Sequence, residues 1–384
     1  MKQITFALTL LFLFGAFANN GVSQTTTHSL FNGNDLTGWS GVNKTEFGVE
    51  DGVMQLKSGM GWLRTDQVFD DFILEFECKP LVENYDSGLF FRSSLDGEPW
   101  PNKGFQVNLK FNGFGTLVRG YQAMIPSEHP PVKVGEWAKF RLVSQGEDAS
   151  LQIDGKDVWE ADFIEPEIGL IGIQAEDRAF EFRNFNIKET GYVNLLEGEG
   201  RDFKHLQVHQ GSQEAWHIDE DGVLVCDGGG GGWIGTKTDD YGDFVFKFDF
   251  WVPKEGNSGI YIRRPKEGDG AYTAMEIQII DDDAKHWGEL QEWQKCGSIY
   301  HEVTPSVRAT REAGQWQTMA IICNDNEIDI YINGVQITDA DLDEYTTSTT
   351  SAKPLKERPR VGYLGFQNYD GMIKYRNAFV KRLN

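Results

Sequence analysis

The sequence has few cysteines and a shortage of basic residues, and each shortage argues against a class of protein. No C-x-x-C spacing relates the four cysteines, Cys78, Cys226, Cys296 and Cys323, so a zinc ribbon is not expected. One disulfide is feasible in an oxidising compartment, but the sequence does not require it. The formal net charge is -23, with 36 Lys and Arg against 59 Asp and Glu, so nucleic acid would be repelled.

Long apolar runs are also missing, with one exception. Residues 4–17 form an apolar stretch that follows Lys2 and runs into Ala16-Phe-Ala18, an A-x-A site. The stretch is too short for a membrane span and is typical of a secretory signal peptide. We therefore predict a signal peptide within residues 1–23, cleaved after Ala18 or after Ser23. The protein is expected to be exported to the periplasm or the medium without a lipid anchor, because no cysteine lies at the cleavage region.

Short alternating segments are abundant and are separated by glycine-rich turns. In residues 243–250 every second residue is Phe, so Phe244, Phe246, Phe248 and Phe250 would share one buried face of a strand. Similar segments recur at short spacings along the whole chain. This pattern predicts an all-β sandwich.

The chain contains two copies of one plan. Ser87-Gly-Leu-Phe-Phe-Arg92 recurs as Ser258-Gly-Ile-Tyr-Ile-Arg263, and Ile153-Asp-Gly155 recurs as Ile332-Asn-Gly334. The shared blocks follow the same order throughout, which indicates a duplication. We predict one domain over residues 25–189 and a second over residues 190–384.

The alternation also predicts a polar wall in the second copy. Tyr261 and Arg263 share one face of their segment, and Glu276 and Gln278 share one face of the next. Neighbouring antiparallel strands would bring these side chains together at the kind of wall where a site is found. The first copy has Gly104 in place of Glu276, so the second copy is expected to be active and the first to carry a degenerate site.

The ordered landmarks resemble the 3-keto-disaccharide hydrolase family in both copies. They include Leu36-Thr-Gly-Trp39, Glu276-Ile-Gln-Ile-Ile-Asp281, Gly297-Ser-Ile-Tyr300, Gly314-Gln-Trp316 and Gln367 followed by Tyr375-Arg-Asn377. The resemblance implies concanavalin A-like jelly rolls, and action on sugars oxidised at carbon 3. One departure is Gln367-Asn-Tyr-Asp-Gly371, where the family often has Gln-Asp-His-Gly.

Chemistry on such a sugar suggests roles for the polar wall. A ketone at carbon 3 makes the carbon 2 hydrogen acidic, so a base can remove it and the group on carbon 1 can leave. Glu276 is the expected base, Arg263 would stabilise the enolate, and Gln278 would orient hydroxyls. A divalent metal ion could assist, held by Asp281 and His286. Sugar contacts are expected from Tyr261, Tyr300, Gln367, Trp287 and Trp293.

Several alternatives compete with these assignments. A lectin-like, non-catalytic carbohydrate-binding protein would use the same fold. Arg263 and Glu276 could simply pair across the strands, and the tryptophans could belong to the core. An ordinary glycosidase needs two carboxylates flanking the bond, and only Glu276 is well placed. The match Gly230-x-Gly232-x-x-Gly235 precedes a strand and lacks a phosphate-binding Lys, so nucleotide binding is not expected.

Overall fold

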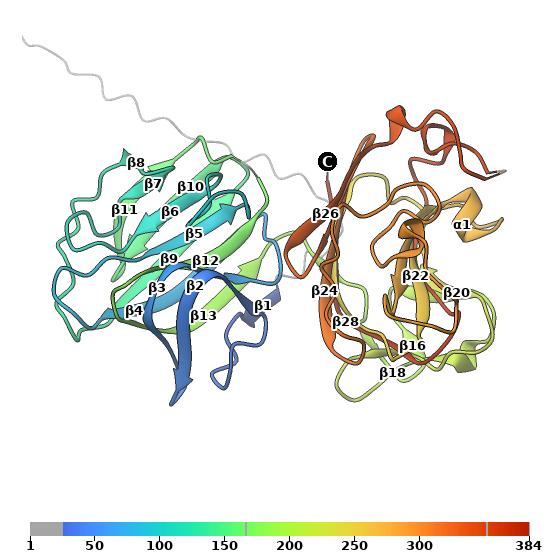
Figure 1. Ribbon diagram of the computed structural model, residues 1–384, viewed down its shortest axis with the longest axis horizontal. Helices are drawn as coiled ribbons and strands as arrows, with labels where there is room; N and C mark the ends of the chain where they lie inside the picture. The colour runs from blue at the N-terminus through green and yellow to red at the C-terminus, as the bar shows by residue number, and fades with distance from the viewer. Residues whose placement is uncertain (1–25, 166, 351, 384) are drawn as a thin grey trace, which may run out of the picture.

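The computed structural model describes residues 26–165, 167–350 and 352–383, and these form two jelly rolls side by side (Figure 1). All the principal pairings are antiparallel, so the predicted all-β class is confirmed. The predicted signal peptide and both of its cleavage sites lie outside the described residues. Among the described residues, no helix is long and apolar enough to cross a membrane.

The first repeat is one continuous sheet that folds over on itself. Its strands are β1 (Thr26–Ser29), β2 (Trp39–Glu50), β3 (Val53–Thr65), β4 (Phe72–Pro80), β5 (Gly88–Ser93), β6 (Phe105–Asn108), β7 (Leu117–Arg119), β8 (Gln122–Ile125), β9 (Ala138–Gln145), β10 (Asp148–Ile153), β11 (Lys156–Ala161), β12 (Leu170–Glu176) and β13 (Phe180–Glu189). The long strand β3 joins the two layers, because its first half pairs with β13 and its second half with β12.

The second repeat divides the same plan between two large sheets and a two-stranded sheet, β15-β16. One large sheet has the order β18-β19-β28-β21-β24-β25-β26, with β14 beside β28, and the other has the order β17-β20-β27-β22-β23. The strands are β14 (Val193–Asn194), β15 (Gly198–Glu199), β16 (Asp202–Phe203), β17 (Leu206–Gln210), β18 (Trp216–Ile218), β19 (Leu224–Cys226), β20 (Trp233–Thr236), β21 (Phe244–Trp251), β22 (Asn257–Arg264), β23 (Met275–Ile280), β24 (Trp316–Asn324), β25 (Glu327–Ile332), β26 (Val335–Asp341), β27 (Tyr363–Gln367) and β28 (Ile373–Arg382). Short helical turns are α1 (Gly270–Thr273), η1 (Gln213–Ala215), η2 (Glu292–Gln294), η3 (Leu342–Glu344) and η4 (Leu355–Glu357).

The phenylalanine row on β21 forms the middle of the second core, as predicted. Phe244, Phe246, Phe248 and Phe250 are fully buried between the two sheets. The Phe246 and Phe248 rings meet Phe366 of the opposite sheet edge-on at centroid distances of 6.0 and 6.3 Å. Burial of each such side chain contributes roughly 1.5–3 kcal/mol to folding, so this row fixes how the two sheets face each other. All four cysteines are buried free thiols.

A buried ionic contact joins the two repeats. The Lys247 ammonium on β21 pairs with the Glu189 carboxylate at the end of β13, and both side chains are almost fully buried. Lys381 adds bonds of 2.8 and 2.7 Å to Asp70 and Asp71 of the first repeat. Buried charges need partners of this kind because desolvation otherwise disfavours them.

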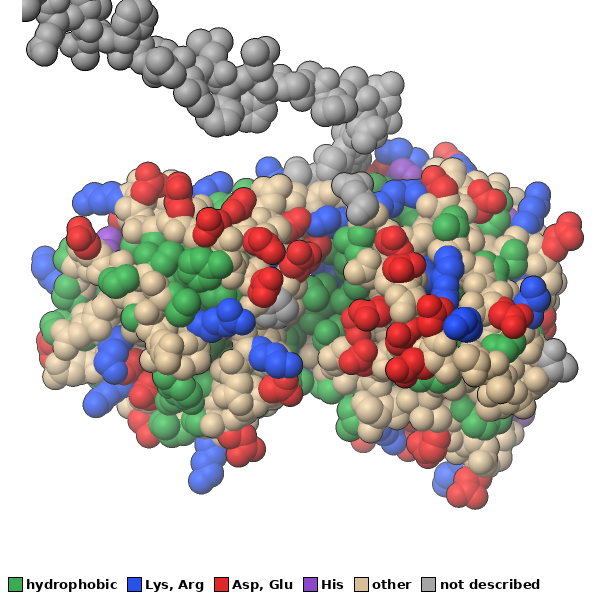
Figure 2. All heavy atoms as spheres, turned by 90° about the horizontal axis from the view of Figure 1, so that it is seen from above, with side chains coloured by type: hydrophobic (Ala, Val, Ile, Leu, Met, Phe, Trp, Pro, Cys, Tyr) green, Lys and Arg blue, Asp and Glu red, His purple; other side chains and the backbone are tan. Residues whose placement is uncertain are grey.

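The larger sheet of the second repeat faces the first repeat, with β24, β26 and β28 toward it (Figure 1). At the hairpin between β25 and β26, the Asn333 carbonyl accepts a hydrogen bond from Arg64. A side chain at Gly334 would meet Arg64 Nη1 at 2.7 Å, so glycine permits this close approach. Seen from above, acidic side chains are spread over both repeats with basic ones among them (Figure 2).

Candidate active site

Two adjacent strands build the polar wall that the alternation predicted. Tyr261 on β22 lies opposite Glu276 on β23, and Gly259 lies opposite Gln278. Opposite residues in an antiparallel pair share one face, so Tyr261, Glu276 and Gln278 point to the same side of the sheet. A side chain at Gly259 would meet Glu276 Oε1 at 2.3 Å. Glycine at this position therefore leaves the space that the carboxylate occupies.

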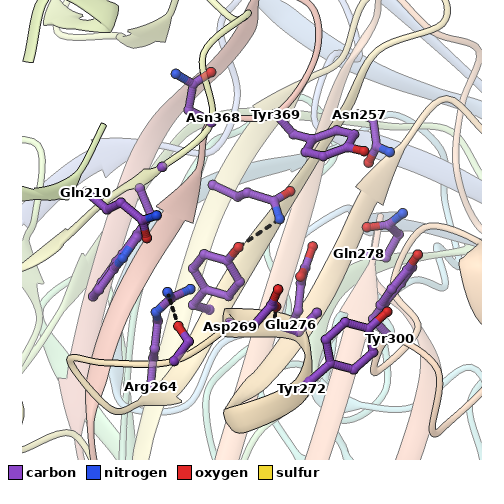
Figure 3. Close-up of a pocket in the computed structure, with 18 of the residues that line it drawn as sticks. Gln210, Asn257, Arg264, Asp269, Tyr272, Glu276, Gln278, Tyr300, Asn368 and Tyr369 are labelled. Carbon is purple, nitrogen blue, oxygen red and sulfur yellow. Dashed lines mark hydrogen bonds between the residues drawn. The ribbon is translucent and has the colours of Figure 1, made fainter. Parts of the chain in front are cut away.

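The wall faces a cavity of about 890 Å³ on the open side of the five-stranded sheet (Figure 3). Its size is in the range of small-molecule sites, roughly 300–1,000 Å³. The lining is rich in amide, carboxyl and aromatic groups, which suits a ligand with many hydroxyls. Of the residues predicted from the sequence, it includes Tyr261, Glu276, Gln278, Trp287, Tyr300 and Gln367.

The Glu276 carboxyl has an unusual protonation equilibrium. Burial raises its pKa to about 8, and the nearby Asp269 carboxylate adds to this rise. The Arg264 guanidinium and the Gln367 amide act in the opposite direction. A carboxyl group that titrates near neutral pH can both accept and return a proton, as general acid–base chemistry requires.

Tyr261 is held tightly at the centre of the wall. Gln367 Nε2 donates a hydrogen bond of 2.7 Å to the Tyr261 hydroxyl oxygen. The Trp233 ring meets the Tyr261 ring edge-on at 6.0 Å, and the Arg264 guanidinium lies 4.2 Å from the centre of the Tyr261 ring. These contacts fix the ring, so its hydroxyl has a defined place beside Glu276.

The predicted position of Arg263 on this wall is wrong. The pairing of β22 with β27 shifts between Tyr261 and Arg264, and Arg263 has a positive φ of 49°. The bulge turns the Arg263 side chain away from the cavity. Its guanidinium instead donates to the Gly242 and Asp325 carbonyls at 2.8 Å each and pairs with Asp243 at 3.2 Å. Arg263 therefore does not meet Glu276.

Arg264 occupies the place expected of Arg263. It lines the cavity, and its guanidinium lies 4.2 Å from the centre of the Tyr261 ring and 4.3 Å from the centre of the Trp233 ring. A side chain at Gly270 would meet Arg264 Nη1 at 1.9 Å, so this glycine lets α1 cover the guanidinium. Strict alternation could not identify Arg264, because one bulge reverses which of two adjacent arginines faces the cavity.

The residues predicted for a metal do not fit one. Neither Asp281 nor His286 lines the cavity. The Asp281 carboxylate accepts backbone N–H bonds from Glu255 and Asp283 at 2.9 and 3.1 Å, which is a turn-capping role. The His286 ring packs edge-on against Trp287 at 4.7 Å. Within residues 26–165, 167–350 and 352–383, no group of three or more His, Cys, Asp or Glu side chains is placed to hold a metal ion.

The predicted aromatic contacts separate into two groups. Trp287 and Tyr300 line the cavity, whereas Trp293 does not. The Trp293 ring is stacked on His301 at 3.7 Å and meets the Tyr300 ring at 5.4 Å, so it supports Tyr300 from the side. Trp293 is half-buried beside a residue of the cavity lining, and its contact with sugar stays a prediction.

Loops supply residues that the sequence analysis missed. Asp269 caps α1 by accepting a bond from the Ala271 N–H at 2.9 Å, and Tyr272 follows on the same turn. Both line the cavity opposite Asn257 and Tyr369 (Figure 3). No periodicity marks loop residues. The only local signal was the pair Asp269-Gly270, which predicts a turn but not that the turn lies beside the cavity.

Fold and site together define a carbohydrate-active jelly-roll protein. The sequence profile of the 3-keto-alpha-glucoside-1,2-lyase-like domain matches residues 26–188 and 191–381, and the chain belongs to this family as two tandem copies. The resemblance inferred from the sequence is confirmed. No curated protein matches the chain.

Three solved structures illustrate the likeness. A proposed glycosyl hydrolase of Parabacteroides distasonis ATCC 8503 is 27% identical, with 50% of this chain and 99% of that chain covered and a TM-score of 0.45. Another from the same organism is 26% identical, with 50% and 94% covered and a TM-score of 0.44. The carbohydrate-binding module CBM66 from Bacillus subtilis is 18% identical, with 40% and 96% covered and a TM-score of 0.35.

Proposed function

We propose that the second repeat cleaves 3-keto-glycosides by removing the carbon 2 proton and eliminating the group on carbon 1, with hydrolysis as the net result. The observation that carries this proposal is the Glu276 carboxyl, buried in the wall of a large polar cavity with its pKa raised to about 8. The family to which the chain belongs supports the substrate class, since its description refers to 3-keto-alpha-glucosides.

Glu276 is the base in this mechanism. The carbon 3 ketone acidifies the hydrogen on carbon 2, and the Glu276 carboxylate accepts that proton as the electron pair forms an enolate. Arg264 stabilises the enolate in place of Arg263. Its Nε and Nη1 are buried without a hydrogen-bond partner among the described residues, and its charge already acts on Glu276. Gln278 and Gln367 are placed to bind sugar hydroxyls.

Elimination then restores the ketone. The enolate electrons form a double bond between carbons 1 and 2, and the bond from carbon 1 to the leaving oxygen breaks. Water adds across that double bond, with its oxygen on carbon 1 and a proton returned to carbon 2. Glu276 can relay this proton from the attacking water to carbon 2, because it is a carboxylate again once the proton that it removed has left it. The sum of the two steps is hydrolysis.

Binding without turnover is the second candidate. It is favoured by Gln367-Asn-Tyr-Asp-Gly371, which lacks the histidine expected from the family. Tyr369 in this segment lies at the cavity rim, with 49% of its surface exposed, and packs against Trp287 at 5.6 Å. Such a rim would bind a sugar face whether or not the bond is cleaved.

We also place this activity outside the cytoplasm, on the basis of the apolar stretch at residues 4–17 and the A-x-A site. Mass spectrometry of the protein recovered from the periplasm or medium should show an N-terminus after Ala18 or Ser23. An intact or acylated N-terminus would contradict export without a lipid.

The purified protein should be incubated in heavy water with 3-keto-α-glucosides and with the unoxidised parent glucosides. The proposal predicts cleavage of the keto sugars only, with deuterium at carbon 2 of the product or of recovered substrate. Efficient cleavage of the parents, or hydrolysis that keeps the original carbon 2 hydrogen, would overturn the mechanism. Tight binding of keto sugars without turnover would establish the binding candidate instead.

A further inference from the structure

The Tyr261 hydroxyl has a proton that its known hydrogen bond does not use. Gln367 Nε2 is the donor in the 2.7 Å bond to this hydroxyl, so the tyrosine oxygen accepts there and its own proton points elsewhere. Burial and the neighbouring Glu276 raise the pKa of Tyr261. The hydroxyl therefore stays protonated and can act as a donor toward the cavity that it lines.

The first repeat shows that this hydroxyl is not needed for packing. Phe90 occupies the position of Tyr261 and is equally buried, with 6% of its surface exposed in each case. Phe90 meets Trp62 edge-on at 5.6 Å, as Tyr261 meets Trp233 at 6.0 Å. The ring contact is thus shared by both repeats. The hydroxyl is present only in the repeat that has the carboxylate and the large cavity.

Tyr261 and Glu276 are direct partners in the antiparallel register. Their side chains start roughly 4.5–5.5 Å apart at Cβ and point to the same side of the sheet. A proton donor and a proton acceptor thus stand next to each other at one wall. This is the arrangement required when one proton leaves carbon 2 and another must reach the oxygen on carbon 1.

We propose that Tyr261 is the catalytic acid of the second repeat and donates its phenolic proton to the leaving oxygen on carbon 1; this inference rests on the proposed function. Glu276 takes the carbon 2 proton, the bond from carbon 1 to oxygen breaks, and the departing oxygen receives the Tyr261 proton. The Tyr261 phenolate then takes the proton held by Glu276. The products are the enone and a neutral alcohol, and both side chains return to their starting states.

Leaving groups of different acidity test this role. With methyl 3-keto-α-glucoside, Tyr261→Phe should lower kcat/KM by about 10²–10³-fold, within the range of general acid catalysis. With the 4-nitrophenyl 3-keto-α-glucoside the loss should be less than about tenfold, since nitrophenolate departs without a proton. In heavy water the variant should still exchange the carbon 2 hydrogen of recovered substrate, because Glu276 remains.

Tyr363→Phe is the matched control. Tyr363 packs against the same Trp233 ring at 5.9 Å but does not line the cavity, so its variant should keep wild-type rates on both substrates. Equal losses on the two substrates for Tyr261→Phe, or no loss on either, would overturn the acid role while leaving the proposed function intact. If the unaltered protein cleaves neither keto sugar, the proposed function fails and the role of Tyr261 fails with it.

Discussion

The concave face of the sheet, which carries the polar wall of β22 and β23 in the second repeat, is open in that repeat and nearly closed in the first. The cavity is about 890 Å³ in the second repeat and about 40 Å³ at the corresponding place in the first. In the first repeat Gln106 donates a hydrogen bond directly to Gln174. In the second repeat Glu276 stands at the position of Gln106, and Gln367, the counterpart of Gln174, is bonded to Tyr261. Glu276 and Gln278 both face the cavity. Polar groups that satisfy each other in one repeat are therefore available to a ligand in the other.

A local difference in the strands accompanies this opening. In the first repeat β3 runs unbroken from Val53 to Thr65. In the second repeat the equivalent chain is divided into β19 and β20 by the glycine run at residues 228–232. Gly231 and Gly232 of this run line the cavity. The glycine run thus has a structural role unrelated to nucleotides, since it interrupts the strand and contributes backbone to the cavity lining.

Positions that the two repeats share are those that hold the fold. Arg92 and Arg263 have φ values of 48° and 49°, and each pairs with an aspartate at the start of a core strand, Asp71 and Asp243 respectively. An arginine that makes the same buried contacts in both repeats is explained by structure alone. The strand register places Gln106 of the first repeat, and not Gly104, at the position of Glu276, since Gln106 lies opposite Phe90 as Glu276 lies opposite Tyr261. Glu276, Tyr261 and Arg264, which replace Gln106, Phe90 and Ser93, are the differences that need a functional explanation.

The first concave face also serves as part of the contact between the repeats. Trp62, Phe90 and Leu170 from this face form one apolar cluster with Ala320, and Tyr331 packs against it. Each Å² of apolar surface buried in such a contact stabilises the packing of the two repeats by roughly 25 cal/mol. One copy of the duplicated face has thus become an interface, and the other has kept a cavity.

Replacing Glu276 with Gln should have the largest effect on activity. It removes the base, so kcat/KM on 3-keto-glucosides should fall by about 10³–10⁴-fold, or roughly 4–5.5 kcal/mol of transition-state stabilisation. Rates are measured with saturating and limiting substrate, and folding is checked by circular dichroism. Gln106→Leu in the first repeat is the control and should keep nearly full activity. Equal losses in the two variants would contradict the assignment of activity to the second repeat.

Breaking the ion pair between the repeats should have the largest effect on stability. Lys247→Met leaves the Glu189 carboxylate buried and unpaired, so the free energy of unfolding should fall by at least about 3 kcal/mol in urea titrations. The double variant Lys247→Met/Glu189→Leu removes both charges and should recover most of this loss. If the double variant is as unstable as the single one, packing at this contact matters more than charge pairing.

The sequence predicted the fold better than it predicted the site, for physical reasons. Period-two alternation and repeated blocks depend on backbone geometry, which every strand obeys, so the β class and the phenylalanine core were predictable. Tyr261, Glu276 and Gln278 were identified because they lie on regular strands, whereas Gln367 was identified from the resemblance to the family. Arg263 was misplaced because a one-residue bulge reverses the faces of a strand, and the bulge has no signature in one sequence.

The loop contributions could not be derived in the same way. Asp269 acts on Glu276 from the turn before α1, in the connection between β22 and β23, where the alternating pattern is interrupted. Trp293 and Trp287 look alike in the sequence, yet only Trp287 lines the cavity. Which of two nearby aromatic residues faces a cavity depends on how a loop packs, and loop packing is set by tertiary contacts rather than by period.

An amide comparison across the repeats should show a smaller effect. Gln367→Leu removes the donor that fixes Tyr261 and a group that faces the substrate, so kcat/KM should fall by about 10–100-fold, or roughly 1.4–2.7 kcal/mol. Gln174→Leu is the same substitution at the equivalent position of the first repeat and should leave kcat/KM unchanged. A comparable loss of activity from Gln174→Leu would show that the first cavity also binds substrate.

The pH dependence of kcat/KM should give the smallest effect, measured per pH unit. It is also the most direct test of Glu276. A base must be deprotonated to act, so kcat/KM should rise about tenfold per pH unit below an inflection near pH 8, the raised pKa of Glu276, and level off above it. An inflection near the ordinary carboxyl value of 4.5 would show that Glu276 is not buried as described.

The same group should make stability depend on pH in the opposite sense. Between pH 4.5, the ordinary value, and about pH 8, the folded protein keeps a proton on Glu276 that the unfolded chain has released. The free energy of unfolding should therefore fall as pH rises through this window, by up to about 1.4 kcal/mol per pH unit from this group.

Glu276→Gln removes the titration, so the variant should gain stability relative to the unaltered protein as pH approaches 8. Urea titrations of both proteins from pH 5 to pH 9 measure this difference, and parallel pH profiles would contradict it. A catalytic carboxyl is expected to lower stability in the pH range where it is most active. The burial that raises its proton affinity also disfavours its charged form.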